Sequence, residues 1–235
     1  RDFCLSRGLG DVYKRQTFLN ETEKRYGRKH VRAMFVPSKT TALTNVLPAY
    51  ADTIDWQSMI RDLQTKVDEP NLIYDLTKTM QSHNEEYIYY RTDHHWTTLG
   101  AYYAYTEFCK AKGITPESLD AYSKKQDFDG FLGSFYNDTS DAKLKANPDT
   151  VTAYYPNAES ICHVTASDGK KYDWPVIYDV SNYNAGLKYS TFIASDNPYT
   201  EIENKDLSDG SSCIVVKESF GNAFIPFLVD HYQTV

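Results

Sequence analysis

Long apolar runs, basic clusters and internal repeats are all missing from this sequence of 235 residues. No run approaches the ~18 consecutive apolar residues of a membrane-spanning helix, so no transmembrane helix is expected within it. Basic residues never cluster over more than a few positions and the formal net charge is -7, which argues against nucleic acid as a partner. The four cysteines, at positions 4, 109, 162 and 213, lack the CxxC spacing of a zinc ribbon.

What remains is the composition of an ordinary globular protein, with 41% hydrophobic and 24% charged residues. A chain of this length can bury one substantial core, which favours a single α/β domain over two small ones. Twenty tyrosines are unusual. Aromatic rings at a wet surface can stack on sugars, but most of these are expected to pack half-buried in strands and helices.

Both ends of the sequence look irregular. Residues 1–16 have no initiator Met, no hydrophobic signal core and no helical or strand periodicity. Their last six residues, DVYKRQ, resemble one reading frame of a widely used transposon-end sequencing adapter. We therefore expect residues 1–16 to be non-native read-through and residues 17–235 to be one domain truncated at both ends. Residues 233–235 are expected to begin a further strand, so the chain as it stands should be marginally stable.

The first half of the domain alternates between strand and helix patterns, which indicates a parallel sheet covered by helices on both faces. Helix 55–67 is amphipathic, with Trp56, Met59, Ile60, Leu63 and Val67 on one face. The expected elements are a charged helix near residues 18–28, a strand at 30–36, the helix at 55–67, a strand at 71–74 and a helix at 77–86.

The second half changes character after a helix predicted at residues 99–112, which Thr97 or Thr98 can cap. Turn-forming residues are frequent between positions 127 and 206, where strand-like runs occur at 150–155, 161–165 and 174–180. Asp168-Gly169 between two such runs indicates a hairpin. These features predict an antiparallel β-rich insertion that forms part of the binding cleft.

Residues 89–100 (YYRTDHHWTTLG) carry the first chemically distinctive motif. A hydrolase or transferase can use an Asp and a His only where the fold holds them rigidly. In an extended segment, Asp93 and His95 would share a face while His94 points the other way. The plain alternative is a surface turn that caps the following helix.

The second motif lies far downstream, where the apolar run CIVV at residues 213–216 leads into Ser219. This pattern predicts a buried central strand, a sharp turn that presents the serine, and then a helix. A serine taken alone is more often a helix cap, but its place after this run favours a nucleophile. We expect Ser219 Oγ to lie about 2.6–3.2 Å from a His95 ring nitrogen, with Val215 and Val216 buried.

Residues 91–100 (RTDHHWTTLG) together with residues 217–228 (KESFGNAFIPFL) resemble the DHHW protein family. That family is similar to alginate O-acetyltransferase-like proteins of the SGNH-hydrolase superfamily, with the motifs in permuted order. The resemblance covers nearly all of residues 17–235. It implies an SGNH-hydrolase-like, flavodoxin-like parallel sheet flanked by helices. It also implies a catalytic triad of Ser219 as nucleophile, His95 as general base and Asp93 as its orienting carboxylate. The chain departs from the family at Glu218, where Asp usually precedes the serine.

An oxyanion needs backbone or amide donors, and the Ser219 N–H at a helix start would supply one. Asn197, in residues 194–198 (ASDNP), resembles the family's Gly-Asn segment although Asp196 replaces the Gly, and an ordinary Asn-Pro turn is the alternative. Asn222 is a poorer candidate because it lies within the helix. Trp96 is expected to pack under the histidine loop, with His94 in a supporting place.

The activity implied is serine-dependent acyl transfer, expected to be acetyl transfer, to or from hydroxyls of a cell-surface or extracellular polysaccharide. A glycan would be the substrate, a membrane-bound protein the acyl-transfer partner, and no cofactor or metal is required. The implied location is extracytoplasmic or at the cell surface, with a membrane anchor on an N-terminal segment outside this sequence. Transferase and esterase share the acyl-serine intermediate, so the sequence does not separate them.

Two other functions remain open. One is a metal site built from Asp93, His94 and His95 with His83 or His163, which is disfavoured because adjacent histidines point apart in a strand and no second ligand lies at helical spacing. The other is a non-catalytic carbohydrate-binding module of the cell envelope. An active-site serine probe separates binding from catalysis.

Overall fold

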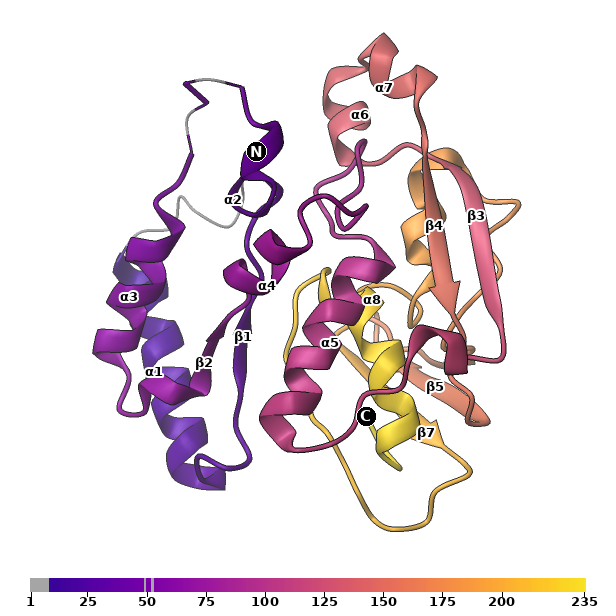
Figure 1. Ribbon diagram of the computed structural model, residues 1–235. Helices are drawn as coiled ribbons and strands as arrows, with labels where there is room; N and C mark the ends of the chain where they lie inside the picture. Colours follow the sequence, from indigo (N-terminus) through magenta and orange to yellow (C-terminus); the bar gives the residue numbers. More distant parts are fainter. Residues whose placement is uncertain (1–8, 49, 52) are drawn as a thin grey trace. The chain divides into compact units, whose positions relative to one another are not determined.

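The computed structural model of this protein describes residues 9–48, 50–51 and 53–235 (Figure 1). The chain forms two compact units, which meet in the sequence between Asn84 and Glu85. The prediction of one domain over residues 17–235 stays a prediction. Residues 1–8 lie outside the described part of the chain, and residues 9–16 form the start of the first helix.

The first unit is built around a two-stranded parallel sheet, in which Ala33 pairs with Ile73 and Phe35 with Asp75. The alternating pattern thus predicted the parallel pairing correctly, but the strands are shorter than expected and the last helix ends at Ser82 instead of residue 86. Its elements are α1 (Leu9–Tyr26), β1 (Ala33–Phe35), α2 (Lys39–Ala42), α3 (Trp56–Lys66), β2 (Ile73–Asp75) and α4 (Thr77–Ser82), with 3-10 turns at Thr44–Val46 and Pro70–Leu72.

Helix α3 supplies the core of this unit. Asp55 caps it by accepting a hydrogen bond of 3.0 Å from the Ser58 backbone N–H. One cluster of buried core residues in this unit comprises Leu19, Ile60, Leu63, Val67 and Ile73. Met59, predicted on the buried face, is 38% exposed because the buried stripe runs through positions 60, 63 and 67.

The second unit joins helices to antiparallel sheets, which confirms the predicted antiparallel β-rich part. Strands β3 and β4 pair with each other, and β5 pairs with both β6 and β7. Its elements are α5 (Thr98–Lys112), β3 (Lys125–Phe131), α6 (Ser134–Thr139), α7 (Ala142–Ala146), β4 (Asp149–Tyr154), β5 (Ser160–Thr165), β6 (Lys171–Trp174), β7 (Tyr199–Asn204) and α8 (Gly221–Phe224), with 3-10 helices at Leu119–Ala121, Ala185–Thr191 and Ile225–His231. The protein is therefore of mixed α/β class with small sheets.

The predicted hairpin at Asp168-Gly169 is present, with Gly169 in the left-handed region at φ +82°. The strand predicted at residues 174–180 is wrong. Strand β6 ends at Trp174, opposite Cys162, because Pro175 follows and cannot donate a ladder hydrogen bond.

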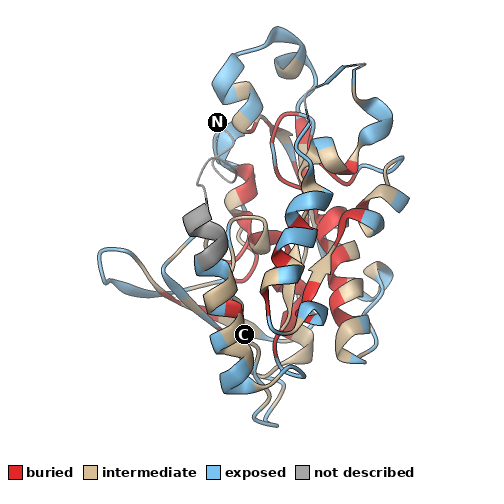
Figure 2. Cartoon of the chain, turned by 90° about the vertical axis from the view of Figure 1, so that its left-hand side faces the viewer, coloured by how far each residue is buried: buried red, intermediate tan, exposed pale blue. Residues whose placement is uncertain are grey.

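Helix α5 has the predicted cap, because Thr97 accepts the Gly100 backbone N–H, and it ends at Gly113 in the left-handed region at φ +69°. Its buried residues pack against α8 and the 3-10 helix that follows, which lie beside α5 in Figure 1, and Figure 2 marks the buried parts of the chain in red. The Tyr105 and Phe227 rings stack at 5.3 Å, and Phe108 meets the edge of Phe224 at 6.0 Å. Phe224 and Phe227 thus pack against a helix.

The buried strand predicted at residues 213–216 is wrong. Ile214 is 87% and Val216 78% exposed, and Val215 is only half-buried. Apart from the hydrogen bond from the Cys213 N–H to the Thr234 carbonyl, no ladder runs along this segment in the described part of the second unit. Thr234 and Val235 are themselves bonded to β7, where Ile202 and Val235 exchange hydrogen bonds of 2.7 and 3.0 Å. An apolar run shows that a segment can form a strand, but burial also requires a neighbouring strand.

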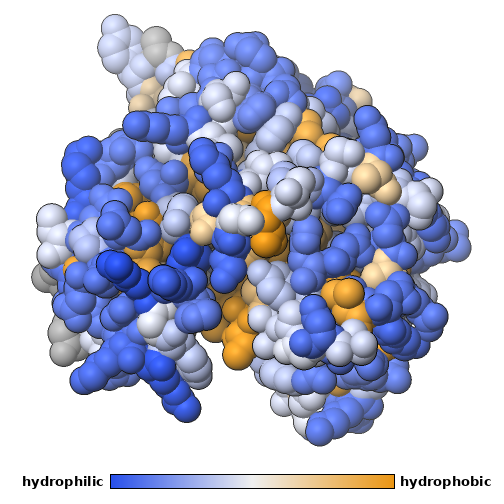
Figure 3. All heavy atoms as spheres, turned by 60° about the horizontal axis from the view of Figure 1, so that its bottom comes forward, coloured by the Kyte–Doolittle hydropathy of each residue, from blue (hydrophilic) through white to orange (hydrophobic). Residues whose placement is uncertain are grey.

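The face of the molecule in Figure 3 is mostly hydrophilic, with separate small apolar patches. Within the described residues, no helix has both the length and the apolar character needed to span a membrane. Cys109, Cys162 and Cys213 are free thiols.

Candidate active site

Asp93 and His95 meet through a local turn. One Asp93 carboxylate oxygen, Oδ1, accepts the His95 backbone N–H at 2.9 Å and lies 2.6 Å from Nδ1 of the His95 ring. A carboxylate that bonds the backbone two residues on is the Asx turn typical of Asp. The sequence predicted that these side chains share a face, and they do, but the segment is bent and not extended.

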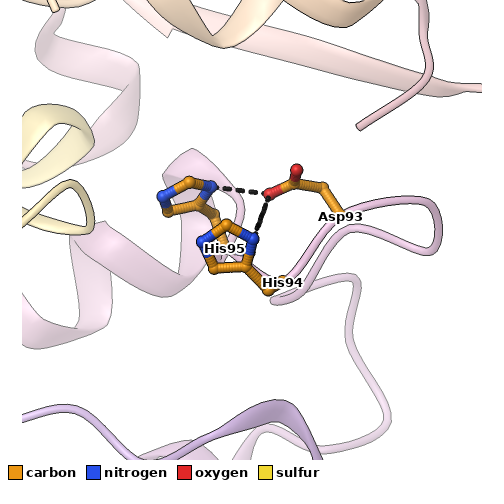
Figure 4. A group of neighbouring side chains, drawn as sticks. All are labelled: Asp93, His94 and His95. Atoms are coloured by element: carbon orange, nitrogen blue, oxygen red, sulfur yellow. Dashed lines mark hydrogen bonds and ion pairs between the residues drawn. The ribbon is translucent and has the colours of Figure 1, made fainter. Parts of the chain in front are cut away.

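His94 does not point away, as an extended segment would require. Its ring centroid lies 3.9 Å from that of His95, and its Nδ1 lies 3.7 Å from the same Asp93 oxygen (Figure 4). The turn places the two successive rings side by side, whereas a strand would have placed them on opposite faces. Nδ1 of His94 also lies 2.7 Å from the Ser134 hydroxyl, so His94 supports the edge of the site.

Ser219 completes a hydrogen-bonded chain of three side chains. Its Oγ lies 2.6 Å from Nε2 of His95, although the two residues are 124 positions apart. Because Nδ1 of His95 faces a carboxylate, that nitrogen carries the proton, and Nε2 is left to accept the serine hydroxyl. The distance lies within the range expected from the sequence.

The carboxylate of Asp93 is buried and fully paired. Its second oxygen, Oδ2, accepts the Ser134 backbone N–H at 2.7 Å. Burial alone would raise the pKa of Asp93, but the hydrogen bonds and charge of His95, together with the Ser134 N–H, outweigh burial and hold this pKa well below its ordinary value. Asp93 is therefore ionised at neutral pH, as an orienting carboxylate must be.

Gly133 makes this approach possible. A Cβ atom at position 133 would overlap the Cβ and carboxylate of Asp93. The peptide between Gly133 and Ser134 can contact the carboxylate only because residue 133 has no side chain. The connection from β3 to α6, within the predicted insertion, thus forms one wall around the Asp93 carboxylate.

A second buried carboxylate anchors the start of the histidine loop. Asp149, at the beginning of β4, is fully buried and accepts the Thr92 backbone N–H at 2.7 Å and the Thr92 hydroxyl at 2.6 Å. It also accepts the Arg91 backbone N–H at 3.0 Å and the Tyr87 hydroxyl. These bonds fix Thr92, the residue next to Asp93, to the start of β4 in the β3–β4 sheet.

Trp96 links the two motifs directly. It is buried, its indole N–H donates to the Phe220 carbonyl at 3.0 Å, and its ring meets the edge of the Phe220 ring at 5.6 Å. The sequence led us to expect only that Trp96 packs beneath the histidine loop. The same side chain also holds Phe220, the residue after the serine.

The predicted oxyanion donors are less defined. The Asn197 side-chain amide donates to the Ala194 carbonyl at 2.8 Å, and its role as an oxyanion donor stays a prediction.

Asn222 is buried, donates to Asp196 at 3.2 Å and accepts from the Lys217 ammonium. Lys217 and Asp196 also form an ion pair at 2.5 Å, so this group joins the serine segment to residues 193–197. Glu218 is exposed, and its carboxylate accepts the Phe220 N–H at 3.0 Å.

The residues of the proposed metal site are only partly together. In the described part of the chain, Asp93, His94 and His95 form one group whose ligand atoms lie within 4.8 Å of one another. Both ring nitrogens of His95 already have partners, Asp93 and Ser219, so a metal there would displace one of them. His163 lies on β5, where its Nδ1 contacts Asp173 at 2.8 Å, and His83 follows α4 in the first unit.

Sequence reasoning missed four residues around this site: Gly133, Ser134, Asp149 and Tyr189. Gly133-Ser134 before a short helix offered a weak signal, since small residues allow close approach of the backbone. Asp149 and Tyr189 offered none, because their contacts with the motif depend on tertiary structure alone.

Three comparisons bear on this geometry. The sequence model of the DHHW protein family matches residues 30–235. A DHHW family protein from Eubacterium siraeum is similar in structure, with a TM-score of 0.79, 29% identity, and coverage of 95% of this chain and 74% of that one. PatB1 from Bacillus cereus has a TM-score of 0.72 at 22% identity over 96% of this chain and 79% of its own. PatB1 with a sulfonyl adduct gives 0.74 at 22% identity, over 96% and 78%. No curated protein matches significantly.

Proposed function

Because this chain belongs to the DHHW protein family, we propose that it catalyses acyl transfer through Ser219, and that its fold is of the SGNH-hydrolase type. The observation that carries the proposal is the hydrogen-bonded chain from Ser219 through His95 to Asp93, with both distances at 2.6 Å. A serine, an imidazole and a buried carboxylate in this order are the parts of a serine nucleophile and its base.

The chemistry follows from the two ring nitrogens. His95 Nε2 takes the Ser219 proton as Oγ attacks an acyl carbonyl, and Asp93 stabilises the imidazolium through Nδ1–H. His95 then returns the proton to the leaving group, which leaves the acyl group on Ser219. In the second half, His95 takes a proton from an incoming hydroxyl as its oxygen attacks the acyl-serine carbonyl. The bond from the acyl group to Ser219 Oγ then breaks, and His95 returns the proton to Oγ, which frees the product and restores the serine hydroxyl.

The incoming hydroxyl decides the product. We propose an acetyl group as the acyl unit and a hydroxyl of a cell-surface or extracellular polysaccharide as the other substrate, as the family resemblance implies. Water in place of the sugar would make the enzyme an esterase. The proposed location is extracytoplasmic, with a membrane-bound protein as acyl-transfer partner. The sulfonyl adduct of PatB1 adds support, since sulfonyl reagents react with activated nucleophiles.

The test is covalent labelling. An active-site sulfonyl probe should label the wild-type protein, and Ser219→Ala should abolish labelling while Ser208→Ala, at an exposed serine, should label normally. Incubation with a small acetyl ester should place acetyl on the Ser219 peptide in mass spectra. A folded wild-type protein that takes up neither probe nor acetyl would favour the carbohydrate-binding module over an enzyme.

Removing metal ions distinguishes the serine mechanism from the remaining alternative, a metal site. Because both His95 ring nitrogens are occupied by protein partners, labelling should be the same before and after dialysis against a chelator. Loss of labelling on dialysis, with recovery on adding a divalent metal, would contradict the serine mechanism. The acceptor is then found by supplying the acetyl ester with different polysaccharides and measuring acetyl on the glycan against free acetate.

A further inference from the structure

One side chain outside both motifs touches the base and the nucleophile together. Tyr189 lies on the 3-10 helix Ala185–Thr191, and its ring stacks on the His95 ring at a centroid distance of 4.2 Å and an angle of 14°. Its hydroxyl donates to the Ser219 backbone carbonyl at 3.0 Å. A single residue therefore sets both the plane of the imidazole and the position of the serine peptide.

Tyr189 is itself held rigidly. It is buried, and its ring makes edge-to-face contacts with Tyr90 at 6.2 Å and Phe192 at 5.4 Å. Burial raises the pKa of Tyr189 well above its ordinary value, so the hydroxyl remains a protonated donor at any working pH. A ring packed this rigidly can fix the orientation of the ring that stacks on it.

The imidazole needs such a surface. The bonds to Asp93 and Ser219 restrain the two nitrogens of His95, but a ring held at two points can still tilt about the line between them. Tyr189 covers one face of the His95 ring, and the centroid of the His94 ring lies 3.9 Å from that of His95. In addition, the face of a neutral tyrosine ring favours a neighbouring cation, which is the state of His95 during proton transfer.

We propose that Tyr189 is a positioning residue for the nucleophile and its base. This inference rests on the proposed function. The ring holds His95 in the plane that aims Nε2 at Ser219, and the hydroxyl fixes the Ser219 peptide. The two contributions are separable, because Tyr189→Phe removes only the hydroxyl and Tyr189→Leu removes the flat ring as well.

The experiment compares these two variants with Tyr183→Leu, a matched loss of an exposed tyrosine just before the same 3-10 helix. Three experiments are done: they measure the rate of labelling by the sulfonyl probe, kcat and KM for a small acetyl ester, and the downfield proton resonance of the short Asp93–His95 hydrogen bond. The last reports the geometry of the base without requiring any reaction.

Tyr189→Phe should lower labelling and kcat about fivefold, as expected for loss of one hydrogen bond, and keep the downfield proton. Tyr189→Leu should lower kcat about 100-fold with KM unchanged and broaden that proton, because the reacting atoms are no longer held in line. Tyr183→Leu should match the wild type in all three.

Wild-type rates and an intact downfield proton in Tyr189→Leu would overturn the proposal. If Tyr189→Leu does not fold, Tyr189→Phe decides, and wild-type labelling and kcat in that variant would overturn it. If the wild-type protein itself is not labelled, the proposed function fails, but the proton resonance still decides whether Tyr189 positions His95.

Discussion

The histidine loop and the serine segment meet in one hydrogen-bonded chain but are built differently. In the loop, Thr92, Asp93, His95 and Trp96 are all buried, and every one of these side chains has a hydrogen-bond partner. In the serine segment, the side chains at positions 214 and 216 are largely exposed. The His95 imidazole thus has a partner at each ring nitrogen, whereas the segment leading to Ser219 is held mainly near its end.

The difference shows where preorganisation comes from. Asp93 and His95 are two residues apart and form their contact through a local turn, so little chain entropy opposes their geometry. Ser219 must be brought to them from 124 residues away. Two side chains supply that restraint: Trp96 of the histidine loop donates to the Phe220 carbonyl, and Tyr189 donates to the Ser219 carbonyl.

The largest effect should follow from changing the charge of the orienting carboxylate. Asp93→Asn keeps the shape but can donate to His95, which favours the wrong tautomer, so the labelling rate of Ser219 should fall by about 10³–10⁴-fold. Asp173→Asn is a matched control, because it changes an exposed carboxylate beside a half-buried histidine on the β5–β6 hairpin. Normal labelling of Asp93→Asn would exclude Asp93 from the mechanism.

The same variant has a pH signature in stability. The pKa of Asp93 is lower in the folded state than in the unfolded chain, so its ionised carboxylate stabilises the fold at pH values above the ordinary carboxyl pKa of about 4. This contribution is lost as the pH falls through the folded-state pKa. Denaturant titrations should show wild type more stable than Asp93→Asn at pH 7, with the difference shrinking below about pH 4. A constant difference across this range would contradict the assignment.

A smaller loss should come from filling the space beside that carboxylate. Gly133→Ala places a methyl group against Asp93, so it should lower the free energy of unfolding by about 1–3 kcal/mol and slow labelling as Asp93 shifts. Gly186→Ala is the matched control, since its added Cβ would meet other atoms only at 3.5 Å or more, an ordinary contact. Equal stability of the two variants would show that Asp93 can move without cost.

The sequence predicted features that form within one segment better than contacts between distant segments. The helix expected at residues 99–112, with Thr97 or Thr98 as its cap, was predictable because propensity and capping act within one segment, and the structure has it at Thr98–Lys112 with Thr97 as the cap. The meeting of Ser219 with His95 was expected from two motifs together with their chemistry. The orientation of His94 was not, because alternation of side chains holds only for an extended backbone and this loop is a turn.

Contacts between residues that are far apart along the chain could not be predicted from the sequence. Asp149 looks like any strand-edge carboxylate, and only the pairing of β3 with β4 brings it to Thr92. Tyr189 is one of twenty tyrosines, and nothing nearby in the sequence distinguishes it. The strand at residues 213–216 failed for the opposite reason, because a strong local pattern was taken to imply a neighbouring strand.

The smallest effect on stability is expected in the apolar run at residues 213–216. It is also the most direct test of the difference between the histidine loop and the serine segment. Because Ile214 is largely exposed, Ile214→Ser should change the free energy of unfolding by no more than about 0.5 kcal/mol. Ile88→Ser, at a fully buried isoleucine beside the histidine loop, should cost at least about 2 kcal/mol. Both substitutions remove the same side chain, so the difference isolates burial. If Ile214→Ser costs as much as Ile88→Ser, residues 213–216 are a buried strand in solution, as their sequence predicts. The nucleophile would then be as firmly supported as its base.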